Sequence, residues 1–249
     1  AMSEAQNIVI LGAASAIAEA AARIWASRGA RLVLVGRDGE RLAAIAADLV
    51  TRGAAQAIPV TLDCARADAR ARLDEMVETL GGLDVLLLAY GALGDQAELE
   101  RDLDAAANLI ATNFTSAAGW CLAAAAILER QRKGALVVIG SVAGDRGRRS
   151  NFIYGATKGG LARLVEGIAH KLAPTGARAV IVEPGFVDTP MTAHIARKGL
   201  LWAKPAQVAA VVVAAADKGG PVVYAPWFWR PIMLIIRLLP TAVFDRLNI

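Results

Sequence analysis

Short apolar runs recur along the chain, and between them lie longer stretches in which apolar residues return every three or four positions. Each run has the length of a strand buried on both faces, and each longer stretch has the spacing of a helix with one apolar face. The predicted strands span residues 7–11, 31–35, 57–62, 85–89, 135–139 and 178–182. The predicted helices include one that ends near residue 29 and others over 39–51, 68–80, 105–133 and 154–172. A helix after every strand predicts an α/β fold with a doubly wound parallel sheet and helices on both faces.

The length and composition favour one domain. The 249 residues are 56% hydrophobic and include 23 glycines, which is enough to bury a single large core. We therefore expect one domain over residues 1–249 with an apolar C-terminal extension over 225–249. Two cysteines and two histidines provide neither a disulfide framework nor a cluster of metal ligands, so we expect no metal. The N-terminus has no signal-peptide pattern, and we expect a cytoplasmic protein.

The chain is mildly basic, with 27 lysines and arginines against 23 acidic residues and a sequence pI near 9.3. Such an excess suits nucleic acid, anionic lipid or a phosphorylated substrate. A recognised nucleic-acid-binding module would interleave basic residues with aromatic ones, and no stretch of this chain does so. We therefore expect no nucleic-acid partner.

Tyr154 and Lys158 stand four positions apart in a predicted helix, so their side chains share one face. An ammonium beside a phenol favours the phenolate and pulls the phenol pKa toward neutrality, which makes tyrosine a usable acid or base. A solvated Tyr/Lys pair has the same spacing and is the alternative. Ser141 follows the strand over 135–139, and the loops after the strands of an open α/β sheet meet at one edge. The pattern predicts a site where a hydroxyl and a phenol converge on one small polar group.

The order and spacing of Ser141, Tyr154 and Lys158 resemble the short-chain dehydrogenase/reductase family, and Asn113 matches the fourth member of its reactive set. The resemblance implies a Rossmann-type fold and an NAD(P)H-dependent reductase that transfers a hydride to a ketone, or the reverse oxidation of an alcohol. In such an enzyme, Tyr154 would donate the proton and Ser141 would hold the carbonyl oxygen. Lys158 would bind the nicotinamide ribose, and Asn113 would hold a water that contacts the lysine.

The first predicted strand runs into a turn and a helix, an arrangement whose backbone N–H groups can hold a pyrophosphate. The family pattern here is G-x-x-x-G-x-G, and only Gly12 matches it, because Ala16 and Ala18 replace the other two glycines. A glycine that opens an Ala-rich helix is also common as plain packing. The resemblance implies that Ser15, Ala16 and Ile17 contact the cofactor.

The second predicted strand is followed by Gly36 and Arg37. Dinucleotide-binding folds choose between cofactors at this position, where an acid would hold a ribose diol and an arginine suits a 2′-phosphate. We therefore favour NADP(H) over NAD(H). The alternative is that Arg37 stacks on the adenine or faces water while Asp38 supplies the acid.

The resemblance implies further cofactor contacts after three later strands. Asp63 would lie beside the adenine amino group with Cys64 next to it, although a helix N-cap explains Asp63 equally well. The family usually shows Asn-Asn-Ala-Gly after the fourth strand, where this chain has Ala89, Tyr90 and Gly91. After the sixth strand the implied contacts are Pro184, Gly185, Val187 and Thr189. The departures at the glycine turn and at the fourth strand are the main support for a second class of function, a non-catalytic dinucleotide-binding protein.

Arg146, Arg148 and Arg149 lie between Ser141 and Tyr154, in the loop beside the expected reacting carbon. The planar guanidinium of arginine can bind phosphate through two N–H groups at once, so these residues predict a substrate that carries phosphate or pyrophosphate. Solvated charge is the alternative.

The C-terminal stretch over 224–240 combines tryptophans, arginines and an apolar helix, and it is too short and too interrupted to span a bilayer. It suits a membrane-surface helix or a lid over a lipid chain, a subunit interface, or ordinary core. Together with the arginine loop and residues 93–95, it resembles the branch of decaprenylphosphoryl-2-keto-β-D-erythro-pentose reductases. That resemblance implies a lipid-linked keto-sugar phosphate as substrate and peripheral contact with the inner membrane surface. A steroid, sugar or acyl substrate is the alternative, and we expect a homodimer or homotetramer.

Overall fold

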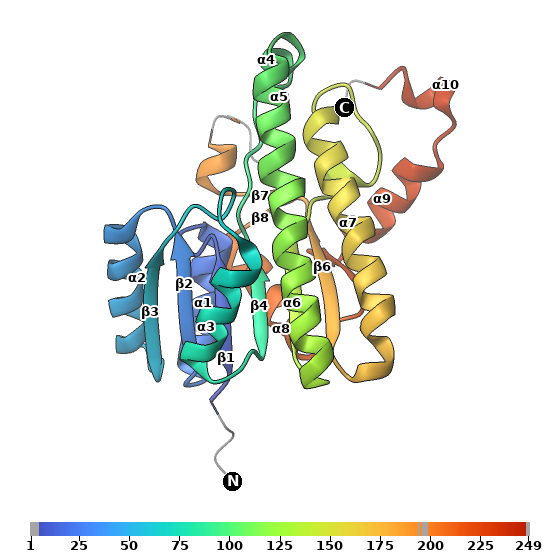
Figure 1. Ribbon diagram of the computed structural model, residues 1–249. Coiled ribbons are helices and arrows are strands. Elements are labelled where there is room, and N and C mark those ends of the chain that lie inside the picture. Colours follow the sequence, from blue (N-terminus) through green and yellow to red (C-terminus); the bar gives the residue numbers. More distant parts are fainter. Residues whose placement is uncertain (1–4, 194, 196–198, 248–249) are drawn as a thin grey trace.

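One seven-stranded sheet, in which all strands run parallel, organises the fold (Figure 1). The computed structural model describes residues 5–193, 195 and 199–247. The strands are β1 (Asn7–Leu11), β2 (Arg31–Gly36), β3 (Gln56–Thr61), β4 (Val85–Leu88), β5 (Ala135–Ile139), β6 (Arg178–Pro184) and β9 (Val222–Ala225). Their order is β3-β2-β1-β4-β5-β6-β9, so the direction of winding reverses between β1 and β4. Ligands of such sheets bind outside the carboxyl ends of the strands at this reversal.

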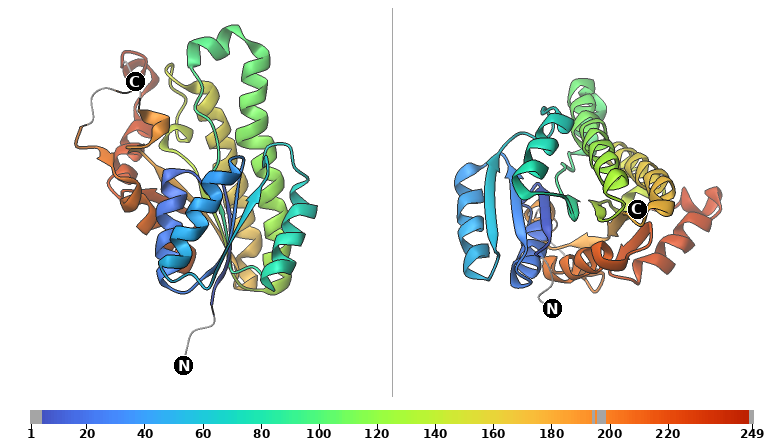
Figure 2. Two further views of the ribbon diagram at one scale, coloured as in Figure 1. Left: turned by 90° about the vertical axis from the view of Figure 1, so that its left-hand side faces the viewer. Right: turned by 60° about the horizontal axis from the view of Figure 1, so that its bottom comes forward.

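Helices cover both faces of the sheet (Figure 2). One face packs against α1 (Ala16–Ser27), α2 (Gly39–Thr51) and α8 (Pro205–Lys218), and the other against α3 (Ala69–Leu80), α6 (Ala117–Gln131) and α7 (Phe152–Leu172). Ile8 and Ile10 of β1 face the first layer, whereas Val9 and Leu11 face the second. All four side chains are fully buried, as expected for a central parallel strand. The structure confirms the predicted doubly wound α/β fold.

The helix predicted over 105–133 is interrupted in the structure. It consists of α5 (Leu103–Ile110), a π-helical stretch over Ala111–Ser116, and α6, and α4 (Gln96–Arg101) precedes it. Within the described part of the chain, Leu103–Gln131 is the one helical stretch whose length and composition would allow it to cross a membrane. Here it packs into the core, where Trp120, Cys121 and Leu128 are fully buried. We therefore interpret it as a core helix.

Two elements of the main sheet and its helix layers lie where the sequence analysis predicted none. They are α8 and β9, and β9 pairs with β6 so that Tyr224 is in register with Glu183. β9 is a short edge strand, so it lacks the long apolar run that identifies the inner strands. Because Ala225 still belongs to this strand, the C-terminal extension begins after Ala225. The extension contains α9 (Trp229–Leu238) and α10 (Thr241–Phe244), which Figure 1 shows in red at the right of the molecule.

A small second sheet lies beyond the carboxyl end of β6. It pairs β7 (Phe186–Val187) with β8 (Trp202–Ala203), and the ring of Phe186 stacks on that of Trp202 at 5.3 Å between centroids. Short 3₁₀ turns at Val142–Gly144, Ala173–Thr175 and Pro190–Thr192 complete the connections. The first and last of these turns contribute residues to the cavity described next.

Candidate active site

A cavity of about 620 Å³ lies at the carboxyl ends of the strands. Its lining comes from the loops after β1, β2, β4, β5 and β6 and from the N-terminal half of α7. This is the crevice that a doubly wound sheet leaves where its strand order reverses. Most of the residues that the sequence analysis assigned to a site line this one cavity.

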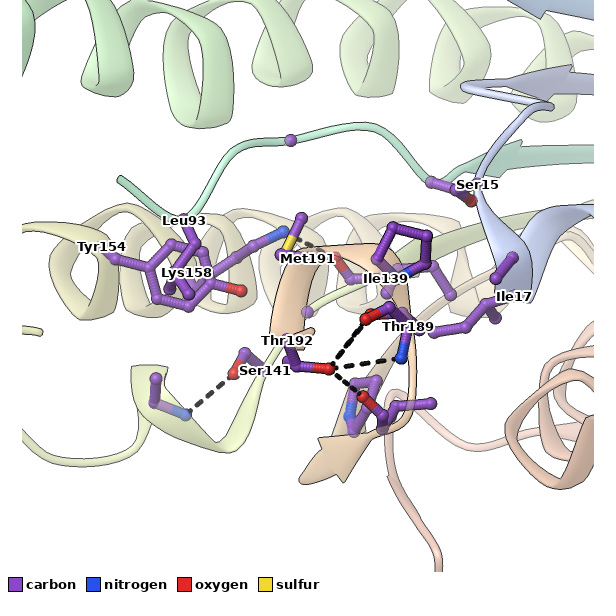
Figure 3. Close-up of a pocket in the computed structure, with 18 of the residues that line it drawn as sticks. Ser15, Ile17, Leu93, Ile139, Ser141, Tyr154, Lys158, Thr189, Met191 and Thr192 are labelled. Carbon is purple, nitrogen blue, oxygen red and sulfur yellow. Dashed lines mark hydrogen bonds between the residues drawn. The ribbon is translucent and has the colours of Figure 1, made fainter. Parts of the chain in front are cut away.

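Ser141, Tyr154 and Lys158 lie together in the cavity wall (Figure 3). Ser141 follows β5, and its Oγ accepts a hydrogen bond from the Ala143 N–H at 3.1 Å. Tyr154 and Lys158 are one turn apart on α7, and Lys158 Nζ lies 5.9 Å from the centroid of the Tyr154 ring. The same Nζ donates to the Ile139 carbonyl at 2.9 Å. The structure therefore brings together the three side chains that the spacing singled out.

Glycines set the close approach between the Ser141 loop and α7. A Cβ on Gly155 would lie 2.7 Å from the Ala143 carbonyl oxygen, and a Cβ on Gly159 would lie 2.8 Å from the Gly144 oxygen. Both distances are too short for a real Cβ, so only glycine lets the two backbones meet. The spacing of Gly155 and Gly159 is four, the same as that of Tyr154 and Lys158. This backbone contact holds the serine loop against the helix that carries the tyrosine.

Burial controls the ionisation of this group. Burial raises the pKa of Tyr154, and a hydrogen bond from Ser141 lowers it in part. Burial also lowers the pKa of Lys158 from 10.5 to about 8. The predicted pull of the Tyr154 pKa toward neutrality is therefore wrong for this structure, because loss of hydration opposes both the phenolate and the ammonium. The tyrosine is held as a neutral phenol, the form that can donate a proton.

Asn113 does not line the cavity but fixes one of its walls. It lies in the π-helical stretch and is 2% exposed. Its Oδ1 accepts the Ala92 N–H at 2.9 Å and its Nδ2 donates to the Ala92 carbonyl at 2.7 Å. These two bonds hold the turn after β4 from a residue that is 21 positions away in the chain. The expected contact of Asn113 with a water beside Lys158 stays a prediction.

The turn after β1 has the features of a phosphate site. Gly12 has a φ of +81°, in the left-handed region, and a Cβ on it would lie 2.8 Å from Tyr90 Cβ. Ser15 caps α1, because its Oγ accepts the Ala18 N–H at 3.3 Å. Ser15, Ala16 and Ile17 line the cavity at the N-terminus of α1, where backbone N–H groups and the helix dipole favour an anion.

The two alanines that replace family glycines have different positions. Ala16 lines the cavity, whereas Ala18 is fully buried in the layer under α1. The extra methyl of Ala18 is therefore part of the core and leaves the cavity unobstructed. The glycine turn, the capped helix N-terminus and the size of the cavity together fit a dinucleotide.

Arg37 lines the cavity, and Arg41, which the sequence analysis missed, lines it one helical turn further on. The Asp38 carboxylate caps α2, because its Oδ1 accepts the Arg41 N–H at 3.0 Å. The alternative in which Asp38 holds a ribose diol therefore competes with this helix cap. The sequence feature that could have identified Arg41 is its spacing of four positions from Arg37.

Three predicted cofactor residues do not line the cavity, namely Gly12, Asp63 and Cys64. Asp63 Oδ1 accepts the Ala65 N–H at 3.0 Å, so its carboxylate closes a local turn instead of capping a helix. Cys64 is buried, and its carbonyl accepts the Trp120 Nε1–H at 2.9 Å. The other predicted contacts, Ala89, Tyr90, Gly91, Pro184, Gly185, Val187 and Thr189, all line the cavity.

Comparison with known proteins decides the family. A family model described as short chain dehydrogenase matches residues 6–199, which include the whole cofactor crevice and the Ser141, Tyr154 and Lys158 group. The chain belongs to the short-chain dehydrogenase family. It is therefore an enzyme of the oxidoreductase class, and the members of this family bind NAD(P).

The relatives of this short-chain dehydrogenase are named as oxidoreductases. It is 38% identical over 244 residues to an uncharacterized oxidoreductase in the mprA 5′ region of Streptomyces coelicolor, with 97% of this chain and 96% of the relative covered. It is 37% identical over 247 residues to the uncharacterized oxidoreductase Rv2073c of Mycobacterium tuberculosis, with 98% and 97% covered. A solved short-chain type dehydrogenase/reductase from Mycobacterium marinum has the same fold, with a TM-score of 0.80 at 22% identity over 92% of this chain and 97% of that one.

The arginine loop of this short-chain dehydrogenase is divided between two roles. Arg148 lines the cavity. Arg146 instead donates to the carbonyls of Ile236 at 2.5 Å and Leu239 at 2.8 Å. Its guanidinium carbon also lies 3.8 Å from the centroid of the Phe244 ring. The structure does not bring Arg146 to the substrate, because the main chain at the end of α9 occupies its N–H groups.

Arg149 is also directed away from the cavity. Its Nη2 donates to the carbonyls of Asp245 at 3.0 Å and Leu247 at 2.7 Å. Backbone carbonyls near the C-terminus carry partial negative charge, and an arginine satisfies them well. Of the three arginines predicted to bind substrate, Arg148 alone lines the cavity, and its contact with substrate stays a prediction.

The C-terminal extension packs on the cavity wall through α9. Trp229 and Met233 are buried, and a Cβ on Gly185 would lie 1.9 Å from the Trp229 ring. The opposite face of the extension is apolar and exposed, and we call it the tail face. Its members are Trp227 (76% exposed), Leu234 (55%), Ile235 (63%) and Leu238 (73%). One side of α9 thus belongs to the enzyme core, whereas the tail face is exposed.

Further residues line the cavity without a signal that sequence analysis recognised. They are Leu93, Asn151, Phe186, Met191, Thr192 and Ile195. Thr192 Oγ1 donates to the Val187 carbonyl at 2.6 Å and accepts the Thr189 N–H at 3.2 Å, which holds this loop in a tight turn (Figure 3). Apart from Asn151, which precedes Tyr154 by three positions, these residues are recognisable only from the fold.

Proposed function

We propose that the protein is a carbonyl reductase in which Tyr154 is the proton donor. The observation that carries the proposal is that Ser141, Tyr154 and Lys158 lie together in the wall of one cavity, with Lys158 buried beside the Tyr154 ring. Bound NAD(P)H supplies the hydride to the carbonyl carbon. Tyr154 gives its phenolic proton to the carbonyl oxygen, and the Ser141 hydroxyl holds that oxygen. The reverse steps oxidise an alcohol.

Lys158 has two roles in this proposal. Its Nζ binds the nicotinamide ribose, and its position beside the Tyr154 ring lets it stabilise the phenolate that forms when the proton leaves. With a pKa near 8, it is still mostly protonated at neutral pH. Asn113 holds the turn at Ala92 and, through a water, contributes to the path by which the tyrosine regains its proton.

The test is the substitution Tyr154→Phe, which keeps the ring and removes the acid. We expect NADPH binding, measured by fluorescence titration, to persist. We expect turnover on a ketone that the wild type reduces to fall by a factor of about 10² or more, the usual effect of a positioned acid. Turnover close to wild type would contradict the mechanism. A loss of NADPH binding would instead show that the substitution damages the cofactor site.

We also propose that NADP(H) is preferred over NAD(H). Arg37 and Arg41 both line the cavity, and the carboxylate of Asp38 is engaged with the Arg41 N–H. Loss of charged hydrogen bonds of this kind costs about 1.5–3 kcal/mol, or roughly a tenfold to hundredfold loss of affinity. We expect Arg37→Ala with Arg41→Ala to weaken NADPH binding by that factor and to leave NADH binding almost unchanged. Arg70→Ala, an exposed arginine on α3, is the control, and tighter binding of NADH than NADPH by the wild type would refute the preference.

We further propose a lipid-linked keto-sugar phosphate as substrate, as the resemblance to the decaprenylphosphoryl-2-keto-pentose reductases implies. Arg148 in the cavity and the tail face support this proposal. Deletion of the extension is a poor test, because α9 also packs on Gly185 and holds Arg146. The better test compares a keto-sugar phosphate with and without a prenyl chain, and we expect a lower KM for the prenylated form. Equal KM values would favour a water-soluble substrate.

A further inference from the structure

Arg148 is a cation in the active-site cavity that forms no salt bridge within the described part of the chain. Its Nη2 makes two long contacts, with the Val142 carbonyl at 3.4 Å and with Met233 Sδ at 3.4 Å. Its Nε is buried and has no hydrogen-bond partner among the described residues. Burial lowers the pKa of Arg148, and the field of Asp145 opposes this in part. A partly buried guanidinium is expected to have an anionic partner, and Arg148 forms no salt bridge with the described residues, because Asp145 acts on it only at a distance.

The surroundings of Arg148 keep it in this position. The Asp145 carboxylate accepts the Tyr224 hydroxyl at 2.9 Å, which ties the start of the loop to β9. Arg146 and Arg149, on either side of Arg148, are bonded to the C-terminal extension. The backbone that presents Arg148 is therefore anchored at three points. A guanidinium so placed is organised in advance for a ligand.

Asn151 is a second polar side chain that lines the same part of the cavity. It is the N-cap residue of α7, and asparagine at this position normally accepts a helix N–H. Its side chain makes no such bond here, and its Oδ1 is buried without a partner among the described residues. An anion would be bound by the Nδ2 group of this amide, which makes no hydrogen bond among the described residues and is interchanged with the unpaired Oδ1 when the amide turns over. The amide lies at the N-terminal end of α7, where the helix dipole favours negative charge.

We propose that Arg148 and Asn151 form an oxyanion subsite next to Ser141 and Tyr154, so that the substrate carries a phosphate or carboxylate close to its reacting carbonyl. The proposal rests on the proposed reductase function. Both residues of the subsite are neighbours of the reactive side chains. The carbonyl that contacts Arg148 belongs to Val142, which directly follows Ser141. Asn151 precedes Tyr154 by one helical turn. In a keto-sugar phosphate, the phosphate stands next to the ketone in this way.

The test uses the full chain with NADPH and two pairs of ketones. Dihydroxyacetone phosphate and dihydroxyacetone share one ketone and differ in the phosphate, and acetoacetate and ethyl acetoacetate differ in the carboxylate. We expect Arg148→Met to lower the ratio of kcat/KM for the anionic over the neutral member by about 10- to 100-fold, the worth of a charged hydrogen bond. Arg148→Lys should recover part of the ratio, because it keeps the charge and loses the fork.

Asn151→Asp is the second variant, because it keeps the shape and the helix-cap preference and adds a like charge beside the bound oxyanion. We expect it to lower the same ratio. Arg130→Met, which removes an exposed arginine at the end of α6, is the control for net charge and should not change the ratio. A lower ratio for the carboxylate pair alone would support the subsite and contradict phosphate as its ligand.

The subsite and the reductase function fail in different ways. If the wild type reduces the ketones but the ratios in Arg148→Met and Asn151→Asp equal those of the wild type, the subsite is wrong and the reductase stands. If no ketone is reduced, the proposed function is wrong for these compounds. Calorimetric binding of glycerol 3-phosphate against glycerol, in the presence of NADP⁺, then decides the subsite. Equal binding of the two, or equal binding by wild type and Arg148→Met, would overturn it.

Discussion

Lys158 combines a fully buried ammonium with a bond to a main-chain carbonyl. It is 5% exposed, and its pKa of about 8 lies below the ordinary 10.5 because burial penalises the charge. Below pH 8 the buried charge therefore destabilises the folded state, whereas the same lysine is hydrated in the unfolded chain. Between pH 8 and 10.5 the unfolded chain binds more protons than the folded one, so the contribution of Lys158 to stability rises with pH.

This sign gives a prediction for Lys158→Met. Between about pH 7 and about pH 9.5, the free energy of unfolding of the wild type should rise by about 2 kcal/mol relative to that of the variant. Chemical denaturation at the two pH values measures it. Lys133→Met, at an exposed lysine, should show no such shift. A difference for Lys158→Met that is independent of pH would mean that the ammonium is well solvated in the folded state.

At the residue scale, the sequence predicted the identity of the reactive group better than its ionisation. Spacing placed Tyr154 and Lys158 on one face of a helix, and the structure agrees. The direction of the Tyr154 pKa depends on burial by residues far away in the chain, which spacing does not reveal. Asp63 shows the same limit, because a carboxylate after a strand can serve either a ligand or its own turn.

At the scale of elements, the contact between the arginine loop and the C-terminal extension was unpredictable. Arg146 and Ile236 are 90 positions apart, and the acceptor is a carbonyl that any residue would provide. The inner strands were predictable because each is a continuous apolar run, whereas the edge strand β9 is short and half-buried. The interruption of the long helix at Ala111–Ser116 has no signal in the composition of that stretch.

This contact gives a second prediction. Arg146→Ala should loosen α9 and α10 more than Arg149→Ala does. Arg146 is partly buried, bonds two carbonyls at the end of α9 and stacks on Phe244, whereas Arg149 is exposed and bonds residues near the end of the chain. We expect a loss of stability of about 1.5–3 kcal/mol for Arg146→Ala. Faster hydrogen exchange over 229–244 is the specific measurement, and equal exchange in the two variants would contradict this ranking.

At the scale of the whole molecule, the tail face is an exposed apolar surface that the proposed chemistry does not explain. Its apolar residues lie beside Arg230 and Arg237, which are exposed. Apolar side chains with flanking arginines suit insertion at an anionic membrane surface. Contact with a second copy of the chain would cover the same residues, and in this family assembly into oligomers is typical.

The prediction for the tail face uses Ile235→Asp with Leu238→Asp. We expect sedimentation with vesicles that contain anionic lipid to be lost, because two charges cannot enter the interface, while turnover of a water-soluble ketone is kept. Leu122→Asp, at an exposed leucine on α6, is the control. Light scattering of the same variants gives the oligomeric state. If the double variant splits an oligomer and vesicle binding is absent from the wild type, the tail face is a subunit interface.

The glycine contact between the Ser141 loop and α7 has a consequence for how such an enzyme changes over evolution. Gly144, Gly155 and Gly159 hold the proton-donating side of the site by backbone against backbone, so substitutions of side chains elsewhere leave that geometry in place. Other parts of the cavity wall, such as the segments after β4 and β6, are carried by separate loops. New substrate ranges can therefore be selected, or engineered, by exchanging those loops while the chemistry is inherited unchanged.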